Sequence, residues 1–334
     1  MKLSIIIPVY NKIRYLATLL RQVQTQTFTD YECLLIDDGS IDGSGAVCDE
    51  FAAQDARFRV FHIPNGGVSH ARNVGLDAAQ GNYVTFIDAD DGVKPDYLER
   101  LLRCIEESGA DLVISGYEKV ADDGHTLQIV MPDRSGIVYF SELLPDFART
   151  QLKTGEYGYC WAKMFPRQLV KNIRFDEGLK LAEDFDFYLH LYAIVDTVCL
   201  DGTAGYRYLQ DAENSTGNTA SEKIDYLAQL RIYLHYREML QKREAYMGEN
   251  RTIVEGRLSD YAYFVLFHTP LPQYKERFEQ LKHLCHEHEI PLTGTKLLRK
   301  WLFCCLRNHQ HQAAEMTMRL YRAARRLRNG GKET

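Results

Sequence analysis

Three aspartates lie within four positions at the end of an apolar segment. Residues 81–87 read GNYVTFI, and Asp88, Asp90 and Asp91 follow directly. A short apolar run after a glycine turn predicts a buried strand, and a lone carboxylate enters such a core only at a large desolvation cost. Carboxylates suit Mg²⁺ or Mn²⁺, and Mg²⁺ commonly combines one or two of them with substrate phosphates. We therefore predict a metal-assisted diphosphate site at Asp88, Ala89 and Asp90; the alternative is a solvated turn that caps the next helix.

A second acidic group, Glu183 and Asp184, opens a segment whose aromatic and leucine residues recur at helical spacing. The acids therefore fall in the first turn of a predicted helix. The helix dipole alone favours carboxylates there by ~0.3–1 kcal/mol, which is the purely structural alternative. A positioned carboxylate can also take a proton from a hydroxyl group, and Asp186 is a weaker candidate for the same task.

The elements that must position these acids alternate along the chain. Apolar segments at 3–9, 31–40, 57–63, 81–87 and 111–116 predict strands, and helical spacing follows at 11–29, 46–54 and 70–80, the last with Ser69 as its N-cap. Pro95 opens a further helix. This alternation predicts a parallel sheet with helices on both faces, so that Asp37, Asp38 and the aspartates after residue 87 gather at one edge.

Composition is that of an ordinary globular protein: 334 residues, 45% of them hydrophobic and 26% charged. No apolar run approaches the ~20 residues of a membrane span, and the short N-terminal apolar run does not resemble a signal peptide. The eight cysteines are scattered and form no C-x-x-C pair, which predicts neither a zinc site nor a disulfide framework. We expect reduced core cysteines and a cytosolic protein.

The net charge of −6 hides an asymmetry, because residues 296–334 alone carry +8. From residue 221 onward four helices are predicted, at 224–246, 251–268, 274–288 and 296–328. The last is basic and amphipathic, which suits either the surface of an anionic membrane or a helix docked on the protein with a solvated basic face.

The sequence contains no G-x-G-x-x-G and no G-x-x-x-x-G-K, which counts against a dinucleotide-binding Rossmann domain and a P-loop. The segments SIIIPVYN, LLIDDGSIDGS, NGGVSHARNVGLDAAQGNYVTFIDADD and AEDFDF, in that order, resemble glycosyltransferase family 2. The resemblance covers residues 1–218. It implies an α/β fold of GT-A type that binds a nucleotide sugar and catalyses its transfer, followed by a helical region at 219–334.

The resemblance also implies where the donor binds. Pro8, Val9 and Tyr10 match the floor under the nucleotide, with Tyr10 against the base. Asp38 matches the acid that accepts a hydrogen bond from the base of a UDP donor, although its DDGS context also suits a simple turn. Arg72 matches an arginine near the donor, where bidentate phosphate contact is the chemical advantage of arginine; a solvated helix residue is the alternative.

The same comparison assigns roles to both acidic groups. Asp88 and Asp90 match the metal-binding D-x-D of the family, which holds Mn²⁺ or Mg²⁺ against the diphosphate, and Asp91 supports the metal. Asp184 is expected to be the base that deprotonates the acceptor, with Glu183 beside it to orient that acceptor.

Three further residues and one loop complete the predicted site. Trp161 resembles a residue that lines the acceptor cleft, with a core tryptophan as the alternative. Lys163 and Arg207 are predicted to meet the diphosphate, and Lys163 could also meet a charge on the acceptor. Residues 211–218 are predicted to form a loop that closes over the donor and excludes water.

Together these features predict a metal-dependent, inverting transferase that moves a hexosyl or N-acetylhexosaminyl unit from a nucleotide sugar, UDP-linked by preference, to a glycan or lipid-linked acceptor. The absence of Q-x-x-R-W after the E-D pair argues against a processive synthase. Surface polysaccharide or glycolipid synthesis at the inner face of a membrane is the expected setting, with no nucleic acid partner. The alternatives are a nucleotidyltransferase and a non-catalytic sugar-nucleotide-binding protein.

Overall fold

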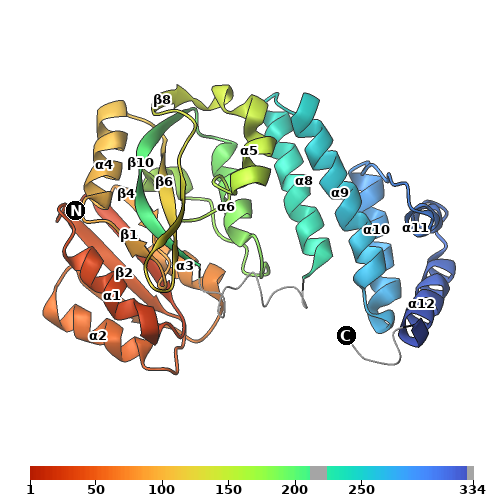
Figure 1. Cartoon of the computed structure of the whole chain (residues 1–334), viewed down its shortest axis with the longest axis horizontal. Coiled ribbons are helices and arrows are strands. Elements are labelled where there is room, and N and C mark those ends of the chain that lie inside the picture. The colour runs from red at the N-terminus through yellow and green to blue at the C-terminus, as the bar shows by residue number, and fades with distance from the viewer. Residues whose placement is uncertain (211–223, 329–334) are drawn as a thin grey trace. The chain divides into compact units, whose positions relative to one another are not determined.

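A computed structural model describes residues 1–210 and 224–328, with side chains as far as Arg325. The chain divides into two compact units, Met1–Glu222 and Lys223–Thr334, and each is described by itself. Figure 1 shows a sheet flanked by helices in the first unit and helices alone in the described part of the second.

The first unit is built on a ten-stranded mixed sheet with the order β3-β2-β1-β4-β9-β6-β10-β5, in which β7 pairs with β6 and β8 with β10. The strands from β3 to β4 are mutually parallel, whereas β9 runs antiparallel to both of its neighbours. The strands are β1 Leu3–Val9, β2 Tyr31–Asp37, β3 Phe58–His62, β4 Tyr83–Phe86, β5 Gly92–Val93, β6 Leu112–Ala121, β7 Thr126–Val130, β8 Gly136–Tyr139, β9 Lys163–Pro166 and β10 Thr197–Gln210.

Helices cover both faces of the sheet. Ile5 and Ile7 of β1 belong to a buried cluster with apolar side chains of α1 and α4. Ile6, which lies between these two residues, points to the opposite face of the sheet and meets α3. Gly75 lets this helix approach closely, because a Cβ on Gly75 would lie 2.4 Å from Ile6 Cγ2. The helices of this unit are α1 Ile13–Gln24, α2 Ser44–Gln54, α3 Val68–Ala78, α4 Tyr97–Ser108, α5 Phe147–Thr154 and α6 Glu183–Tyr192.

The five predicted strands are confirmed as β1 to β4 and β6, but two other expectations in this unit are wrong. Ser69 does not cap α3, because the helix already begins at Val68 and its N-cap is Gly67, with φ of +90°. The cysteines are not all reduced, because Cys104 on α4 and Cys199 on β10 form a disulfide across 95 residues of sequence. Spacing alone could not show that a helix and a distant strand bring these two sulfur atoms together.

The second unit contains α8 Tyr226–Lys242, α9 Gly248–His268, α10 Tyr274–Glu287, α11 Leu297–Arg307 and α12 His311–Arg328. The single long helix predicted for 296–328 is wrong: it breaks after Arg307, and His309 adopts a left-handed φ of +57°. Among the described residues, no helix combines the length and apolar character that crossing a membrane requires.

Several basic side chains of the last two helices bind within this unit. Arg299 donates to Asp260, Arg307 to the Leu292 carbonyl, and Arg322 to the carbonyl groups of Phe267 and Thr269 at the end of α9. These contacts hold α11 and α12 to the rest of the unit, as the docked-helix alternative requires.

Candidate active site

The three aspartates after β4 each have a different partner. Asp88 Oδ1 lies 3.1 Å from Arg72 Nη2, and Asp90 forms an ion pair with Lys12. Asp91 accepts a hydrogen bond of 2.6 Å from the Tyr206 hydroxyl on β10. Two of the three carboxylates therefore have a cation as partner, one from α3 and one from the start of α1, and the third is held by a strand far along the chain.

Asp91 is oriented inward. Its second oxygen accepts from the Leu209 backbone N–H at 2.8 Å, and burial, together with the charges of Asp90 and Asp88, raises its pKa well above the usual range. The Tyr206 hydroxyl also accepts from the Asp88 N–H at 3.1 Å. Asp91 thus braces the loop from behind, while the Asp88 and Asp90 side chains remain 29% and 34% exposed.

Arg72 connects the two acidic groups that the sequence singled out. Its side chain is only 5% exposed, lies over the Phe175 ring, and places Nη1 at 2.9 Å from Glu183 Oε1 while Nη2 contacts Asp88. The alternative of a solvated helix residue is wrong for Arg72. One guanidinium group instead fixes the start of α6 next to the loop after β4.

Asp184 occupies the first turn of α6, which begins after Ala182 in a left-handed conformation with φ of +62°. Burial and the neighbouring charge of Glu183 raise the pKa of Asp184 to about 7, although Arg72 acts in the opposite direction. A carboxyl group with that pKa can exchange a proton near neutral pH, as a general base must.

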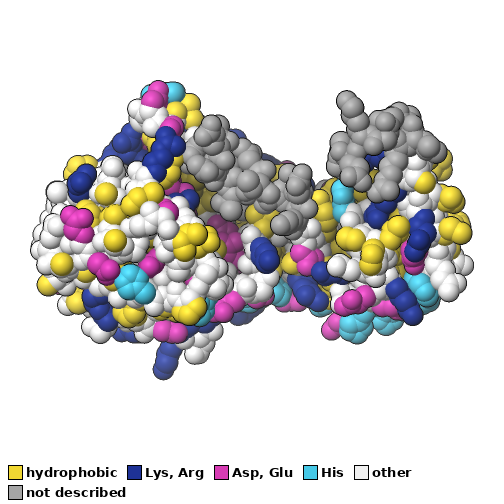
Figure 2. Space-filling model, turned by 90° about the horizontal axis from the view of Figure 1, so that it is seen from below, with side chains coloured by type: hydrophobic (Ala, Val, Ile, Leu, Met, Phe, Trp, Pro, Cys, Tyr) yellow, Lys and Arg dark blue, Asp and Glu magenta, His cyan; other side chains and the backbone are white. Residues whose placement is uncertain are grey.

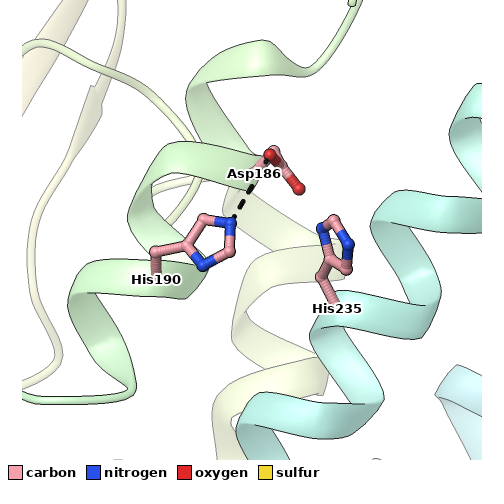
Figure 3. A group of neighbouring side chains, drawn as sticks. All are labelled: Asp186, His190 and His235. Atoms are coloured by element: carbon pink, nitrogen blue, oxygen red, sulfur yellow. Dashed lines mark ion pairs between the residues drawn. The ribbon is translucent and has the colours of Figure 1, made fainter. Parts of the chain in front are cut away.

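Asp186, the weaker candidate for the base, lies two residues after Asp184 in α6, which is ~200° further around the helix axis. It is 3% exposed and pairs with His190 one turn later, at 3.9 Å (Figure 3). His235, the third residue drawn in Figure 3, belongs to the other unit, which is described separately.

The predicted nucleotide floor lies at the carboxyl end of β1. Val9 is fully buried, whereas Tyr10 is 48% exposed and offers a ring to a ligand. Asp38 is buried, and its two oxygens accept backbone hydrogen bonds from Gly66 at 2.7 Å and Gly67 at 2.9 Å. Asp38 therefore holds the loop before α3 in place, and its contact with a base stays a prediction.

Two predicted contact residues lie inside the protein. Lys163 is 1% exposed and donates to the carbonyl groups of Glu156 and Tyr159, each at 2.6 Å, and burial lowers its pKa to about 8. Trp161 is 3% exposed and stacks between Tyr159 and Tyr206, with ring centroids 4.4 and 4.7 Å away. In this structure Lys163 braces a core segment and Trp161 supports Tyr206; contact of either side chain with a ligand stays a prediction.

Arg207 lies nearer to the acids. It lines a cavity of about 300 Å³ together with Asp90, Asp91 and residues of α1 and the β6–β7 turn. Its guanidinium contacts the Gly124 carbonyl at 2.9 Å and Glu118 at 3.6 Å. The predicted closing loop at 211–218 lies outside the described residues.

The sequence reasoning missed Lys12 and Tyr206. Each lies directly beside a predicted site segment: Lys12 follows PVYN, and Tyr206 precedes Arg207. Their partners could not be predicted from the sequence, because Lys12 contacts Asp90 across 78 residues and Tyr206 contacts Asp91 across 115 residues.

The residues present fit a divalent cation. Asp88 and Asp90 offer partly exposed carboxylates, and each is balanced by a side-chain cation. Oxygen ligands of this kind, with room for substrate phosphates, are those that Mg²⁺ and Mn²⁺ prefer.

Comparison with known proteins agrees with this geometry. The family model described as glycosyl transferase family 2 matches residues 4–173. The uncharacterized glycosyltransferase EpsJ of Bacillus subtilis strain 168 is 31% identical over 241 residues, which cover 70% of each chain. Three further curated glycosyltransferases match over 30–56% of their own length.

Solved structures show the same fold. S. aureus TarS 1-349 in complex with UDP-GlcNAc superimposes with a TM-score of 0.65 at 21% identity, covering 97% of this chain and 92% of that one. The mannosyltransferase PcManGT of Pyrobaculum calidifontis, in complex with GDP-Man and Mn²⁺, gives 0.51 at 14% identity, with 96% and 86% covered. The first unit thus has the GT-A type of fold, and the chain belongs to glycosyltransferase family 2.

Proposed function

We propose that this protein is a metal-dependent, inverting and non-processive glycosyltransferase that moves a hexosyl or N-acetylhexosaminyl unit from a UDP sugar to an acceptor hydroxyl. The observation that carries the proposal is the Arg72 bridge, which joins Asp88 at 3.1 Å and Glu183 at 2.9 Å. Through this bridge Asp88, a proposed metal ligand, lies close to the start of α6, the helix that bears Asp184.

In the proposed reaction Asp184 removes the proton of the acceptor hydroxyl as its oxygen attacks the anomeric carbon, while Glu183 orients the acceptor. A divalent cation held by Asp88 and Asp90 would stabilise charge on the leaving diphosphate. Arg72 stays in place between the two acidic groups and adds positive charge on the diphosphate side. A single displacement inverts the anomeric carbon, through a transition state with oxocarbenium character.

The choice of nucleotide and metal is supported by two structural neighbours: TarS was solved with UDP-GlcNAc and with UDP, and PcManGT with GDP-Man and Mn²⁺. We carry UDP and Mn²⁺ or Mg²⁺ over to this chain as proposals, with Asp38 and Tyr10 on the base.

We further propose a cytoplasmic enzyme of surface polysaccharide or glycolipid synthesis that touches an anionic membrane through its C-terminal helices. Exposed apolar side chains support this contact, namely Leu297, Trp301, Met316 and Leu320. Figure 2 shows hydrophobic and basic side chains next to one another at the end of the second unit. Apolar side chains among cations are typical of an interfacial surface.

The test is release of UDP from a panel of UDP sugars in the presence of Mn²⁺ and without acceptor. We expect slow release from one sugar, abolished by EDTA and in Asp90→Asn, whereas Asp184→Asn still binds that donor and fails to transfer it. Turnover unaffected by EDTA would remove the metal from the proposal. Neither binding nor turnover of any UDP sugar would indicate another nucleotide or a non-catalytic protein.

A further inference from the structure

Lys12 lies between β1 and α1 and is the only residue that pairs with Asp90 among the ion pairs of the described residues. The Lys12 side chain is 28% exposed and the Asp90 side chain 34%. The ammonium group therefore lies against a proposed metal ligand, at a place that solvent can reach.

The backbone around Lys12 is held firmly in place. The Asn11 N–H donates to Ser40 Oγ at 3.1 Å, and the Lys12 N–H donates to Ser44 Oγ at 2.8 Å. The first N–H of α1, from Ile13, donates to Asp42 Oδ2 at 3.0 Å. Because these contacts fix the start of the helix, the direction of the Lys12 side chain toward the loop after β4 is built into the fold.

A lysine at this place has an electrostatic cost. The N-terminal end of a helix carries partial positive charge and disfavours a cation. Lys12 is the N-cap of α1 and makes no side-chain capping bond. The ion pair with Asp90 offsets this cost. If Asp90 binds a metal ion instead, Lys12 loses its partner, and binding of another anion near its ammonium group becomes favourable.

Lys12 and Arg72 neutralise the two aspartates in different ways. Arg72 is 5% exposed, held by two carboxylates and packed on the Phe175 ring, so it has no freedom to leave. Lys12 has one carboxylate partner and a flexible four-carbon chain at the surface. Of the two cations, Lys12 is the one that can be exchanged.

We propose that Lys12 is an exchangeable counter-cation of Asp90: a divalent metal displaces its ammonium group, which then pairs with the diphosphate of the donor. This inference rests on the proposed metal-dependent function and assigns a positioning role to Lys12. It follows that Lys12 opposes metal binding in the absence of nucleotide and strengthens the coupling between metal and nucleotide when both are bound.

The experiment is a calorimetric titration of the full chain with MnCl₂, with and without saturating UDP, for wild type and Lys12→Met. Without UDP, Lys12→Met should bind Mn²⁺ about 1.4-fold to fivefold more tightly, the range expected when no partly exposed ion pair must be broken first. The factor by which UDP tightens Mn²⁺ binding should fall by a similar amount.

Lys2→Met is the matched control. Lys2 pairs with Glu106 at 3.1 Å and lies at the opposite end of β1, so the variant changes net charge equally. The seven residues of β1 span ~20 Å at ~3.3 Å per residue, more than twice the Debye length of ~8 Å at 0.15 M salt. We expect Mn²⁺ binding of Lys2→Met to match wild type in both conditions.

The outcomes separate this inference from the proposed function. Equal Mn²⁺ affinity and equal coupling in wild type and Lys12→Met would overturn the role of Lys12 and leave the metal site standing. Weaker Mn²⁺ binding in Lys12→Met would also overturn it. If neither wild type nor Lys12→Met binds Mn²⁺ even with UDP, the proposed metal dependence is wrong, and the proposed role of Lys12 is wrong as well.

Discussion

Arg72 on α3 and Glu183 on α6 form an ion pair of 2.9 Å across 111 residues of sequence. The same guanidinium reaches Asp88, so the loop after β4 and the start of α6 are held at a fixed separation. Removal of this one side chain would therefore affect a proposed metal ligand and the neighbourhood of the proposed base together.

Arg72→Met should destabilise the first unit by ~3 kcal/mol, because it leaves the mostly buried Glu183 and the partly exposed Asp88 without their cation. Arg72→Lys keeps the charge but cannot span both partners, so it should retain most of the stability and lose most of the transfer activity. Urea denaturation and donor turnover measure the two effects. Arg134→Lys, at the exposed pair with Glu142, is the control and should change neither. Full activity in Arg72→Lys would contradict the bridge.

Tyr206→Phe removes the hydroxyl that donates to Asp91 and accepts from the Asp88 N–H. A buried carboxylate that loses a donor costs ~1–3 kcal/mol, and the loop that bears the proposed metal ligands loses a support. We expect weaker Mn²⁺ binding in calorimetry as well as a lower melting temperature. Tyr208→Phe alters the same aromatic stack around Trp161 and serves as the control. Unchanged Mn²⁺ affinity in Tyr206→Phe would separate Tyr206 from the metal site.

The sequence predicted the sheet well wherever burial is continuous. β1 and β2 read as nearly continuous apolar runs, interrupted only by Ser4 and Glu32 before the strand ends, because both faces of each strand are covered. The acids that follow β2 and β4 therefore had to lie at the sheet edge. The break at His309 was hidden, because the apolar spacing continues in both α11 and α12 and a single residue with positive φ leaves no periodic signal.

Side-chain direction at the site was predicted less well. Lys163 has the residue type of a phosphate contact, yet it points inward to two carbonyl groups, and only the packing around β9 decides this. Arg72, Lys12 and Tyr206 obtain their roles from partners that lie between 16 and 118 residues away. Spacing within one segment carries no information on such partners.

The disulfide between Cys104 and Cys199 predicts six free thiols among the eight cysteines. Thiol titration of protein unfolded without reductant should count six, and eight after reduction. Cys104→Ser should give seven in both conditions. A count of eight without reductant would restore the expectation of a fully reduced cytosolic protein, since disulfides are rare in that compartment.

Asp184→Asn should abolish transfer and yet stabilise the protein at pH 8. The Asp184 pKa is raised from 3.8 to about 7 in the folded protein by burial and by Glu183. The folded state therefore binds more protons than the unfolded state between these values, so wild-type stability falls as pH rises through that window. Asparagine mimics the neutral acid and avoids this loss, so the variant should be more stable by more than ~1 kcal/mol at pH 8 and similar to wild type below pH 4.

Asp55→Asn is the control of opposite sign, because a hydrogen bond from Arg57 lowers the Asp55 pKa to about 2. Stability from that carboxylate is present above pH 3.8 and is lost as pH falls toward 2, so Asp55→Asn should be destabilised at pH 8.

The same pKa of Asp184 predicts that kcat/KM for transfer rises with pH through about 7, since only the carboxylate form accepts a proton. A flat profile through pH 7, or an Asp184→Asn variant less stable than wild type at pH 8, would remove Asp184 from the role of base.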